Sequence, residues 1–154
     1  MTDELVAWLR EQVAEDERVA QAAGGLRWIR GEDSGWTGSF VIEDQAGVEV
    51  AGPGYEGGGV RSEEQAAHIA RHDPARVLAE VAAKRRILEL HLPWTGEQND
   101  DGRYCSTCVG YPINSSGHIG VAWPCPTVRL LASVYRGRPG WRSEWAPDEE
   151  ENRG

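Results

Sequence analysis

Long apolar runs are missing from this chain of 154 residues. No stretch reaches the roughly eighteen consecutive apolar residues that a membrane-spanning helix needs, so we expect no membrane span. The N-terminus also lacks the basic segment and the apolar segment of a secretory signal peptide. These absences predict a cytoplasmic protein, and in that reducing compartment paired cysteines are more often metal ligands or redox groups than structural disulfides.

Positive charge is also scarce. Sixteen lysines and arginines stand against 25 aspartates and glutamates, which leaves a net charge of −9. Because each contact to a phosphate needs a cation, this balance argues against nucleic acids and anionic membranes as partners. The acids are divided between residues 1–25 and 148–151, which makes a phosphate-mimicking decoy a weaker alternative. Basic residues gather over 71–86, which we interpret as a solvated helix face; a docking face for an acidic protein partner is the alternative.

Two motifs of nucleotide or peptide chemistry are absent. The glycine-rich segment 52–60 has neither the spaced glycines nor the Lys-Ser/Thr ending of a phosphate-binding loop. His68 and His72 share one helix face, as in catalytic zinc helices, but Ile69 stands where such helices carry the glutamate base. We therefore interpret both histidines as cations favoured near a helix C-terminus. A polar site built from these histidines and Arg71 is the alternative.

Apolar periodicity and capping signals predict several helices. The first ends at two consecutive glycines. Ser62 and Gln65 form a capping box that opens the second, and Asp73 is placed to cap the third. The helices are predicted over 2–24, over 62–72, over 74–91 and from Cys125 to Gly137.

Strand signals are fewer. Residues 38–51 predict a β-hairpin with a turn at Gln45-Ala46-Gly47, and the alternation of Ile119, Val121 and Trp123 predicts a short strand. We expect Trp141 and Trp145 to fold back onto the domain. The chain thus predicts an α+β fold in a single domain. The domain is expected over residues 1–145, and a disordered acidic tail over 146–154 follows it. Within the domain we expect an N-terminal helix over 2–24, a hairpin over 38–51, helices over 62–91 and a zinc-binding subdomain over 91–145.

Three cysteines and one histidine form the main candidate site. Cys105 and Cys108 make a C-x2-C pair, and Cys125 follows at a predicted helix start, where the helix dipole favours a thiolate. His91 closes the preceding helix. Three thiolates and one imidazole are typical ligands of tetrahedral zinc. Since all four ligands come from the protein, no position stays open for water, and the predicted zinc is structural.

Two alternatives to this assignment stay open. His118 is nearer in sequence to the cysteines and lies in a glycine-rich segment, although we prefer His91 as the fourth ligand. The cysteines could also be buried or redox-active thiols without a metal. A redox C-x2-C normally opens a helix, whereas the Val109-Gly110-Tyr111-Pro112 segment after Cys108 indicates a turn.

Several segments, taken in order, resemble a known family. They are His68-Ile-Ala-Arg-His-Asp-Pro-Ala-Arg-Val-Leu78, Lys84-Arg-Arg-Ile-Leu88 with His91, the Cys105/Cys108 pair, Pro124-Cys-Pro-Thr-Val-Arg-Leu-Leu-Ala132, and Trp145. Over about residues 1–147 the chain resembles a family of small uncharacterised proteins from actinobacteria and their phages. Members often carry a His-Pro pair after the last helix; Arg138-Pro139 stands there in this chain, so no histidine ligand is expected at that place. The resemblance implies a source and a fold outline but no activity.

Together these observations favour a non-enzymatic binding or regulatory module, with a structural zinc and a role as a phage or prophage accessory protein. The rival is a small hydrolase or nucleotide-handling enzyme that uses His68, Arg71, His72 and Asp73. A pocket that joins the histidine pair to a second polar cluster would favour the enzyme. An exposed apolar or charged patch would favour the binding module.

Overall fold

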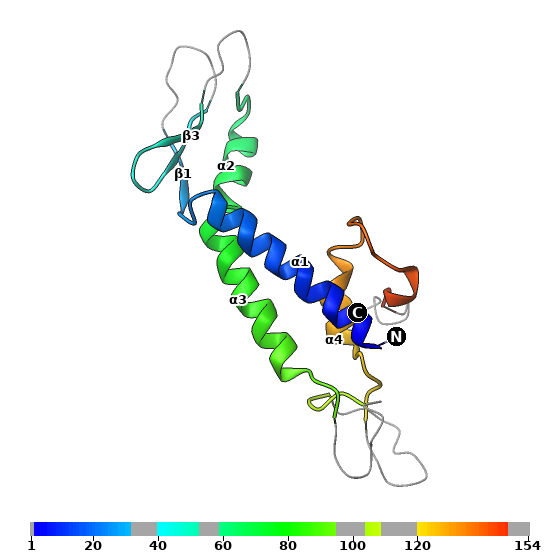
Figure 1. Cartoon of the computed structure of the whole chain (residues 1–154). Coiled ribbons are helices and arrows are strands. Elements are labelled where there is room, and N and C mark those ends of the chain that lie inside the picture. The colour runs from blue at the N-terminus through cyan, green and yellow to red at the C-terminus, as the bar shows by residue number, and fades with distance from the viewer. Residues whose placement is uncertain (1, 32–39, 53–58, 95–103, 109–119, 148–154) are drawn as a thin grey trace. The chain divides into compact units, whose positions relative to one another are not determined.

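The structure is a computed structural model that describes residues 2–31, 40–52, 59–94, 104–108 and 120–147 (Figure 1). Four helices and a three-stranded antiparallel sheet confirm the predicted α+β class. The elements are α1 (Thr2–Ala22), β1 (Trp28–Arg30), β2 (Ile42–Asp44), β3 (Glu49–Ala51), α2 (Glu63–Arg71), α3 (Pro74–Leu90), α4 (Pro126–Ser133) and a short 3-10 helix (Ser143–Trp145).

The chain divides into two compact units, and each is described by itself. The first unit combines Met1–Ala14 with Ala83–Gly154, and the second is the continuous segment Glu15–Ala82. The helices α1 and α3 therefore each contribute residues to both units. The single domain expected over residues 1–145 stays a prediction.

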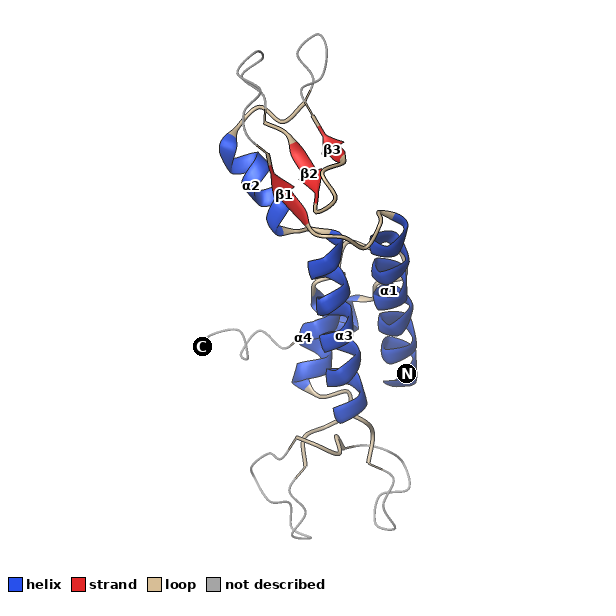
Figure 2. Cartoon of the chain, turned by 90° about the vertical axis from the view of Figure 1, so that its left-hand side faces the viewer, coloured by secondary structure: helices blue, strands red, loops and turns tan. Residues whose placement is uncertain are grey.

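In the second unit, α2 packs against the sheet formed by β1, β2 and β3 in that order (Figure 2). Ile42 lies at the centre of this packing. It pairs with Arg30 of β1 and with Ala51 of β3, and a bulge follows it in the second pairing. Its side chain is fully buried and joins Val60 and Ala66 in a small apolar core. This burial is what fixes the face of the sheet that α2 covers.

The hairpin predicted over 38–51 is confirmed for its described residues, since β2 and β3 are joined by a tight turn. Gly47 has a φ of +78°, which a residue with a side chain rarely adopts. The Asp44 carboxylate accepts hydrogen bonds from the N–H groups of Ala46 and Val48, at 2.8 and 3.0 Å. The third strand, β1, was not predicted, because three residues are too few for alternation to be visible in the sequence.

The predicted helix boundaries are mostly confirmed. Gly24 and Gly25 end α1 with φ values of +95° and +66°. Ser62 caps α2 by accepting the N–H of Gln65 at 3.1 Å. The last helix was wrongly extended to Gly137. It ends at Ser133, because the next backbone N–H groups bond three residues back instead of four (Tyr135 to Ala132, Arg136 to Ser133, Arg138 to Tyr135).

In the first unit, the expected folding back of Trp141 and Trp145 is confirmed. Their rings lie 5.6 and 5.4 Å from the ring of Trp8 on α1, measured between centroids. The Trp8 indole N–H donates to the carbonyl of Pro139 at 3.0 Å. Because Trp8 and Trp145 are both buried, this aromatic cluster supplies much of the apolar core of the unit.

Some predictions fall outside the described residues. They concern residues 38–39 of the hairpin, most of the glycine-rich segment 52–60, Ile119 of the short strand, and the acidic tail from residue 148 onward. Of that short strand, Ala122 makes an isolated bridge with Tyr104. Among the described residues, no helix has the length and apolar character that crossing a membrane requires.

Asp73 links two elements of the second unit. Its side chain is only 5% exposed. One carboxylate oxygen accepts the N–H of Arg76 at 2.7 Å, which confirms the predicted cap of α3. The other oxygen accepts the N–H of Trp28 at 3.2 Å, so the same carboxylate also fixes the start of β1.

We predict that Asp73→Ala lowers the free energy of unfolding by about 2 kcal/mol, because it removes a cap and leaves a second buried N–H without its acceptor. Ser62→Ala is the matched control, since Ser62 caps the neighbouring helix with one exposed hydrogen bond. It should cost about 1 kcal/mol or less. Urea denaturation of both variants measures the difference; equal losses would show that the bond to Trp28 contributes nothing.

Candidate metal centre

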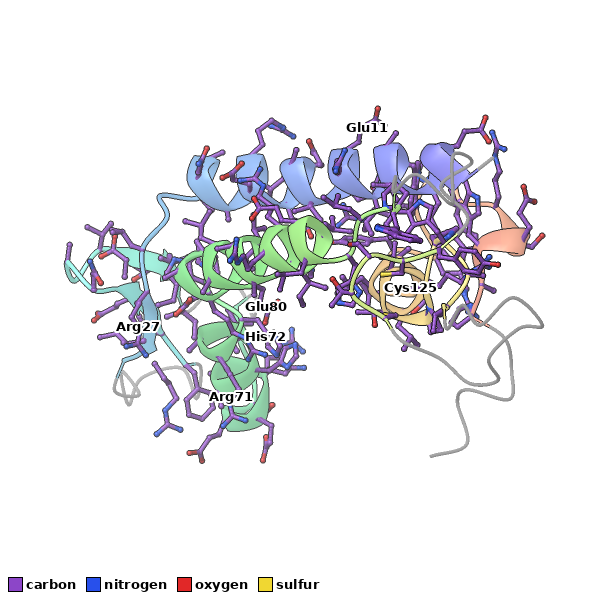
Figure 3. All side chains as sticks on the ribbon, turned by 90° about the horizontal axis from the view of Figure 1, so that it is seen from below. Glu11, Arg27, Arg71, His72, Glu80 and Cys125 are labelled. Carbon is purple, nitrogen blue, oxygen red and sulfur yellow. The ribbon has the colours of Figure 1, made fainter. Side chains whose placement is uncertain are left out.

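Three separate segments of the first unit supply the predicted metal ligands. His91 directly follows α3, and its N–H donates to the carbonyl of Ile87 at 3.0 Å. Cys105 and Cys108 lie in a described stretch without helix, residues 104–108. Cys125, which is labelled in Figure 3, is the N-cap residue of α4. Pro126 begins this helix. The ligands thus come from one helix end, one turn and one helix start.

Backbone hydrogen bonds hold these segments side by side. Residues 104–106 lie between residues 92–94 and residues 120–122, in antiparallel pairing. The N–H of Trp94 donates to the carbonyl of Tyr104 at 2.8 Å, and the N–H of Ser106 donates to the carbonyl of Leu92 at 2.8 Å. On the other side, the N–H of Cys105 donates to the carbonyl of Val121 at 2.9 Å. This framework places Cys105 between the segment that follows His91 and the segment that leads to Cys125.

The four ligand atoms converge on one point. The Nδ1 atom of His91 lies 3.4 Å from the sulfur of Cys105, 3.3 Å from that of Cys108 and 3.4 Å from that of Cys125. All four atoms lie within 4.8 Å of one another. Zinc with bonds of about 2.3 Å to sulfur and about 2.0 Å to nitrogen separates tetrahedral S and N ligands by about 3.5 Å. The observed spacing therefore suits a zinc ion, and the donor set suits it as well.

The three thiols differ in exposure. Cys125 is 0% and Cys105 is 5% exposed, whereas Cys108 is only half-buried. None of the three is in a disulfide. Residues 104–108 are not helical, whereas a redox C-x2-C pair normally lies at a helix start. The turn predicted for residues 109–112 lies outside the described residues.

The thiols also differ in their tendency to ionise. Burial raises the pKa of Cys105, but the backbone N–H groups of Thr107 and Cys108 outweigh it, so that this pKa is lowered overall. Burial and the two neighbouring thiols raise the pKa of Cys108 to about 12. Burial also raises the pKa of Cys125, although the backbone N–H of Val128 at the start of α4 opposes it. Thiolates this close to one another repel, and a divalent ion held by the four ligand atoms would offset the repulsion.

Two side chains that support the site were not identified from the sequence. The hydroxyl groups of Ser106 and Thr107 both donate to the carbonyl of Leu90, the residue before His91. The Ser106 hydroxyl also accepts the N–H of Leu92 at 3.3 Å. These hydrogen bonds connect the turn between the two cysteines to the end of α3. The only signal was the pair of hydroxyl residues inside the C-x2-C motif.

The alternative fourth ligand, His118, lies outside the described residues. The structure brings His91 to the cysteines, and its Nδ1 atom is the one that faces them. That leaves the other ring nitrogen free to be the N–H of the imidazole, as a metal-bound histidine requires.

The second candidate site, built around His68 and His72, is less compact than the cysteine cluster. The rings of His68 and His72 lie 4.4 Å apart between centroids, tilted by 40°, and both are exposed at the C-terminal end of α2. His68 lines a cavity of about 460 Å³, whose other described lining residues are Gly59, Val60, Glu64, Gln65 and Ile69. Arg71, His72 and Asp73 are not among them, and Asp73 is engaged by two backbone N–H groups. The structure therefore does not bring the four residues of the rival enzyme site into this cavity.

Fold and cluster together define a small α+β protein with a three-cysteine, one-histidine centre in its C-terminal half. The chain belongs to a family of unknown function, DUF6221, whose model matches residues 2–147. No curated protein and no solved structure matches it. The predicted resemblance to a family of uncharacterised proteins is thereby confirmed over nearly the same residues, while the expected source in actinobacteria and their phages stays a prediction.

For the metal-free protein we predict a loss of stability as pH rises from 9.0, the ordinary thiol pKa, towards the folded pKa of Cys108 at about 12. A raised pKa means that folding favours the protonated thiol, so its contribution is present at lower pH and is lost on ionisation. The stability difference between the wild type and Cys108→Ser, measured by urea denaturation from about pH 8 to about pH 11, should shrink. A difference that does not change with pH would contradict the assigned environment of Cys108.

Proposed function

We propose that this DUF6221 protein is a non-enzymatic binding or regulatory module whose C-terminal half is held by one structural zinc. The ligands are His91, Cys105, Cys108 and Cys125. The observation that carries the proposal is the convergence of one ring nitrogen and three sulfurs within 4.8 Å. Such a set has the number, the chemistry and the spacing of a complete tetrahedral zinc shell.

A structural role follows from the completeness of this shell. A catalytic zinc keeps one position for water or substrate, whereas here the protein supplies all four ligands. Two of the sulfurs are buried, which leaves little access for a substrate. The ion would join the end of α3, the turn at 104–108 and the start of α4, which are separated in sequence by long connections. Binding energy at such a site is folding energy.

The surface supports a protein as the partner. Leu90, Leu92 and Trp94, which lead away from the metal centre, are 48%, 42% and 41% exposed. Exposed large apolar side chains that follow one another closely in the sequence support a contact surface here. The basic stretch over 71–86 is a weaker candidate, because two of its arginines already pair with glutamates on the same helix (Arg76 with Glu80 at 2.7 Å, Arg86 with Glu89 at 3.2 Å).

We also propose a cellular location and a biological role. Three cysteines without a disulfide suit the reducing cytoplasm, where thiolates remain available to zinc. The resemblance to actinobacterial and phage proteins supports a role as a phage or prophage accessory protein. With a net charge of −9, we do not propose nucleic acid as the partner.

The metal and its fourth ligand are tested together. Protein purified without a chelator should contain about one zinc per chain by elemental analysis. His91→Ala should lose most of this zinc and melt at a markedly lower temperature, because structural zinc contributes on the order of 10 kcal/mol to folding. His118→Ala is the matched control and should keep both properties.

Two outcomes would contradict these assignments. Loss of zinc in His118→Ala but not in His91→Ala would move the fourth ligand to His118. A folded, zinc-free wild type with three freely titrating thiols would refute the metal centre itself.

One observation favours a second candidate, a small hydrolase or nucleotide-handling enzyme. It is the cavity of about 460 Å³ beside His68, which also offers the polar side chains of Glu64 and Gln65. The absence of a glutamate base beside the histidine pair weighs against it, because Ile69 occupies that place.

The double variant His68→Ala, His72→Ala separates the two functions. If the protein is a binding module, this variant should keep its single zinc and its melting temperature within a few degrees, since both side chains are exposed. Elemental analysis and thermal denaturation measure both. Loss of a second metal equivalent, or a crystal structure with an ion between the two imidazoles, would make the enzyme the better proposal.

A further inference from the structure

We propose that Cys108 is a site of oxidation by hydroperoxides, and that its oxidation to a disulfide with Cys105 releases the zinc. The inference rests on the proposed structural zinc and adds to it a reactive position and a chemical class of reactant. It follows from the unequal surroundings of the three sulfurs.

Access singles out Cys108. Cys125 is fully buried and Cys105 nearly so, whereas Cys108 is half-buried at the end of its turn. The two residues between the paired cysteines, Ser106 and Thr107, are exposed, so the turn itself lies at the surface. A small dissolved oxidant therefore reaches Cys108 before it reaches the other two sulfurs.

Zinc would hold the partly exposed Cys108 sulfur as a thiolate, which is the form that oxidants attack. The partial exposure of Cys108 and the exposed turn beside it therefore make this sulfur the first one that an oxidant meets.

The partner of the disulfide is set by chain connection. Cys105 and Cys108 belong to one short turn, and their sulfurs lie within 4.8 Å. A disulfide needs a sulfur separation of about 2 Å, which this turn can reach by moving alone. Bonding to Cys125 would instead require the start of α4 to move, and Cys125 is completely buried there.

The reaction balances with hydrogen peroxide as the oxidant. The Cys108 thiolate attacks one peroxide oxygen, the O–O bond breaks, and hydroxide leaves and becomes water with a proton from solvent. The resulting sulfenic acid is attacked at sulfur by the Cys105 thiolate, the S–O bond breaks, and a second hydroxide becomes water. Two sulfurs have given up two electrons, and one peroxide has become two waters. After this step only His91 and Cys125 would remain to hold the zinc, and two ligands would be too few to retain it.

The test uses the zinc-loaded wild-type protein and hydrogen peroxide. Zinc release is followed with a chromogenic chelator, and about one zinc should be lost for each disulfide formed. Dithiothreitol with added zinc should restore the loaded form. Remaining thiols are then alkylated and the protein is cut with trypsin, which leaves all three cysteines in one peptide, Tyr104–Arg129. In this peptide, backbone fragmentation between Cys108 and Cys125 should give separate fragments, with the alkyl group on Cys125.

A second measurement tests the order of reactivity. Limited treatment of the zinc-loaded protein with N-ethylmaleimide should label Cys108 before Cys105 and Cys125. The urea-unfolded, zinc-free protein is the control and should label all three at similar rates.

The outcomes distinguish this inference from the proposed function. A zinc-loaded protein that keeps its zinc in peroxide, or that forms its disulfide through Cys125, overturns the inference and leaves the structural zinc intact. First labelling at Cys105 or Cys125 overturns the reactive position. Protein that holds no zinc before oxidation overturns the proposed function, and the release step with it.

Discussion

The close approach of three cysteines to one histidine, with the four ligand atoms within 4.8 Å of one another, is the constraint on which the candidate metal centre of the first unit depends. Their sulfurs are brought together by a backbone framework that forms from ordinary hydrogen bonds, and burial then makes their simultaneous ionisation unfavourable. The proposed cation would offset this cost at all three sulfurs. The framework also leads to the end of α3 and the start of α4, so the four ligand atoms lie where three segments of the chain meet.

The features that could be predicted from the sequence are those encoded locally. Helix caps at Ser62 and Asp73 and the glycines after α1 are recognisable, because each acts within a few residues of its own position. The candidate pair Cys105 and Cys108 was recognisable for the same reason, since a C-x2-C turn presents two sulfurs together. The strand β1 was not, because three residues become a strand only through the partner they pair with, β2.

The supporting interactions of both sites were hidden for a related reason. Asp73 shows its capping role in the sequence, but its bond to Trp28 spans 45 positions and has no local signal. The hydroxyl groups of Ser106 and Thr107 donate to the carbonyl of Leu90, which lies 16 and 17 positions earlier in the sequence, and no local signal predicts these bonds either. For a side chain with one local and one distant hydrogen bond, the sequence therefore reveals the local bond and not the distant one.

The contact between the two ends of the first unit imposes an order on its synthesis. Trp8 bonds to Pro139, and Arg142 pairs with Glu4 at 2.8 Å, so two residues of α1 gain these partners only after a much later segment has been made. The second unit, Glu15–Ala82, is one continuous stretch and depends on no later segment for its sheet. On the ribosome, therefore, the middle of the chain can fold while the first turns of α1 still lack their partners. The ring of Trp8 is covered by the rings of Trp141 and Trp145 only after those two residues have been made.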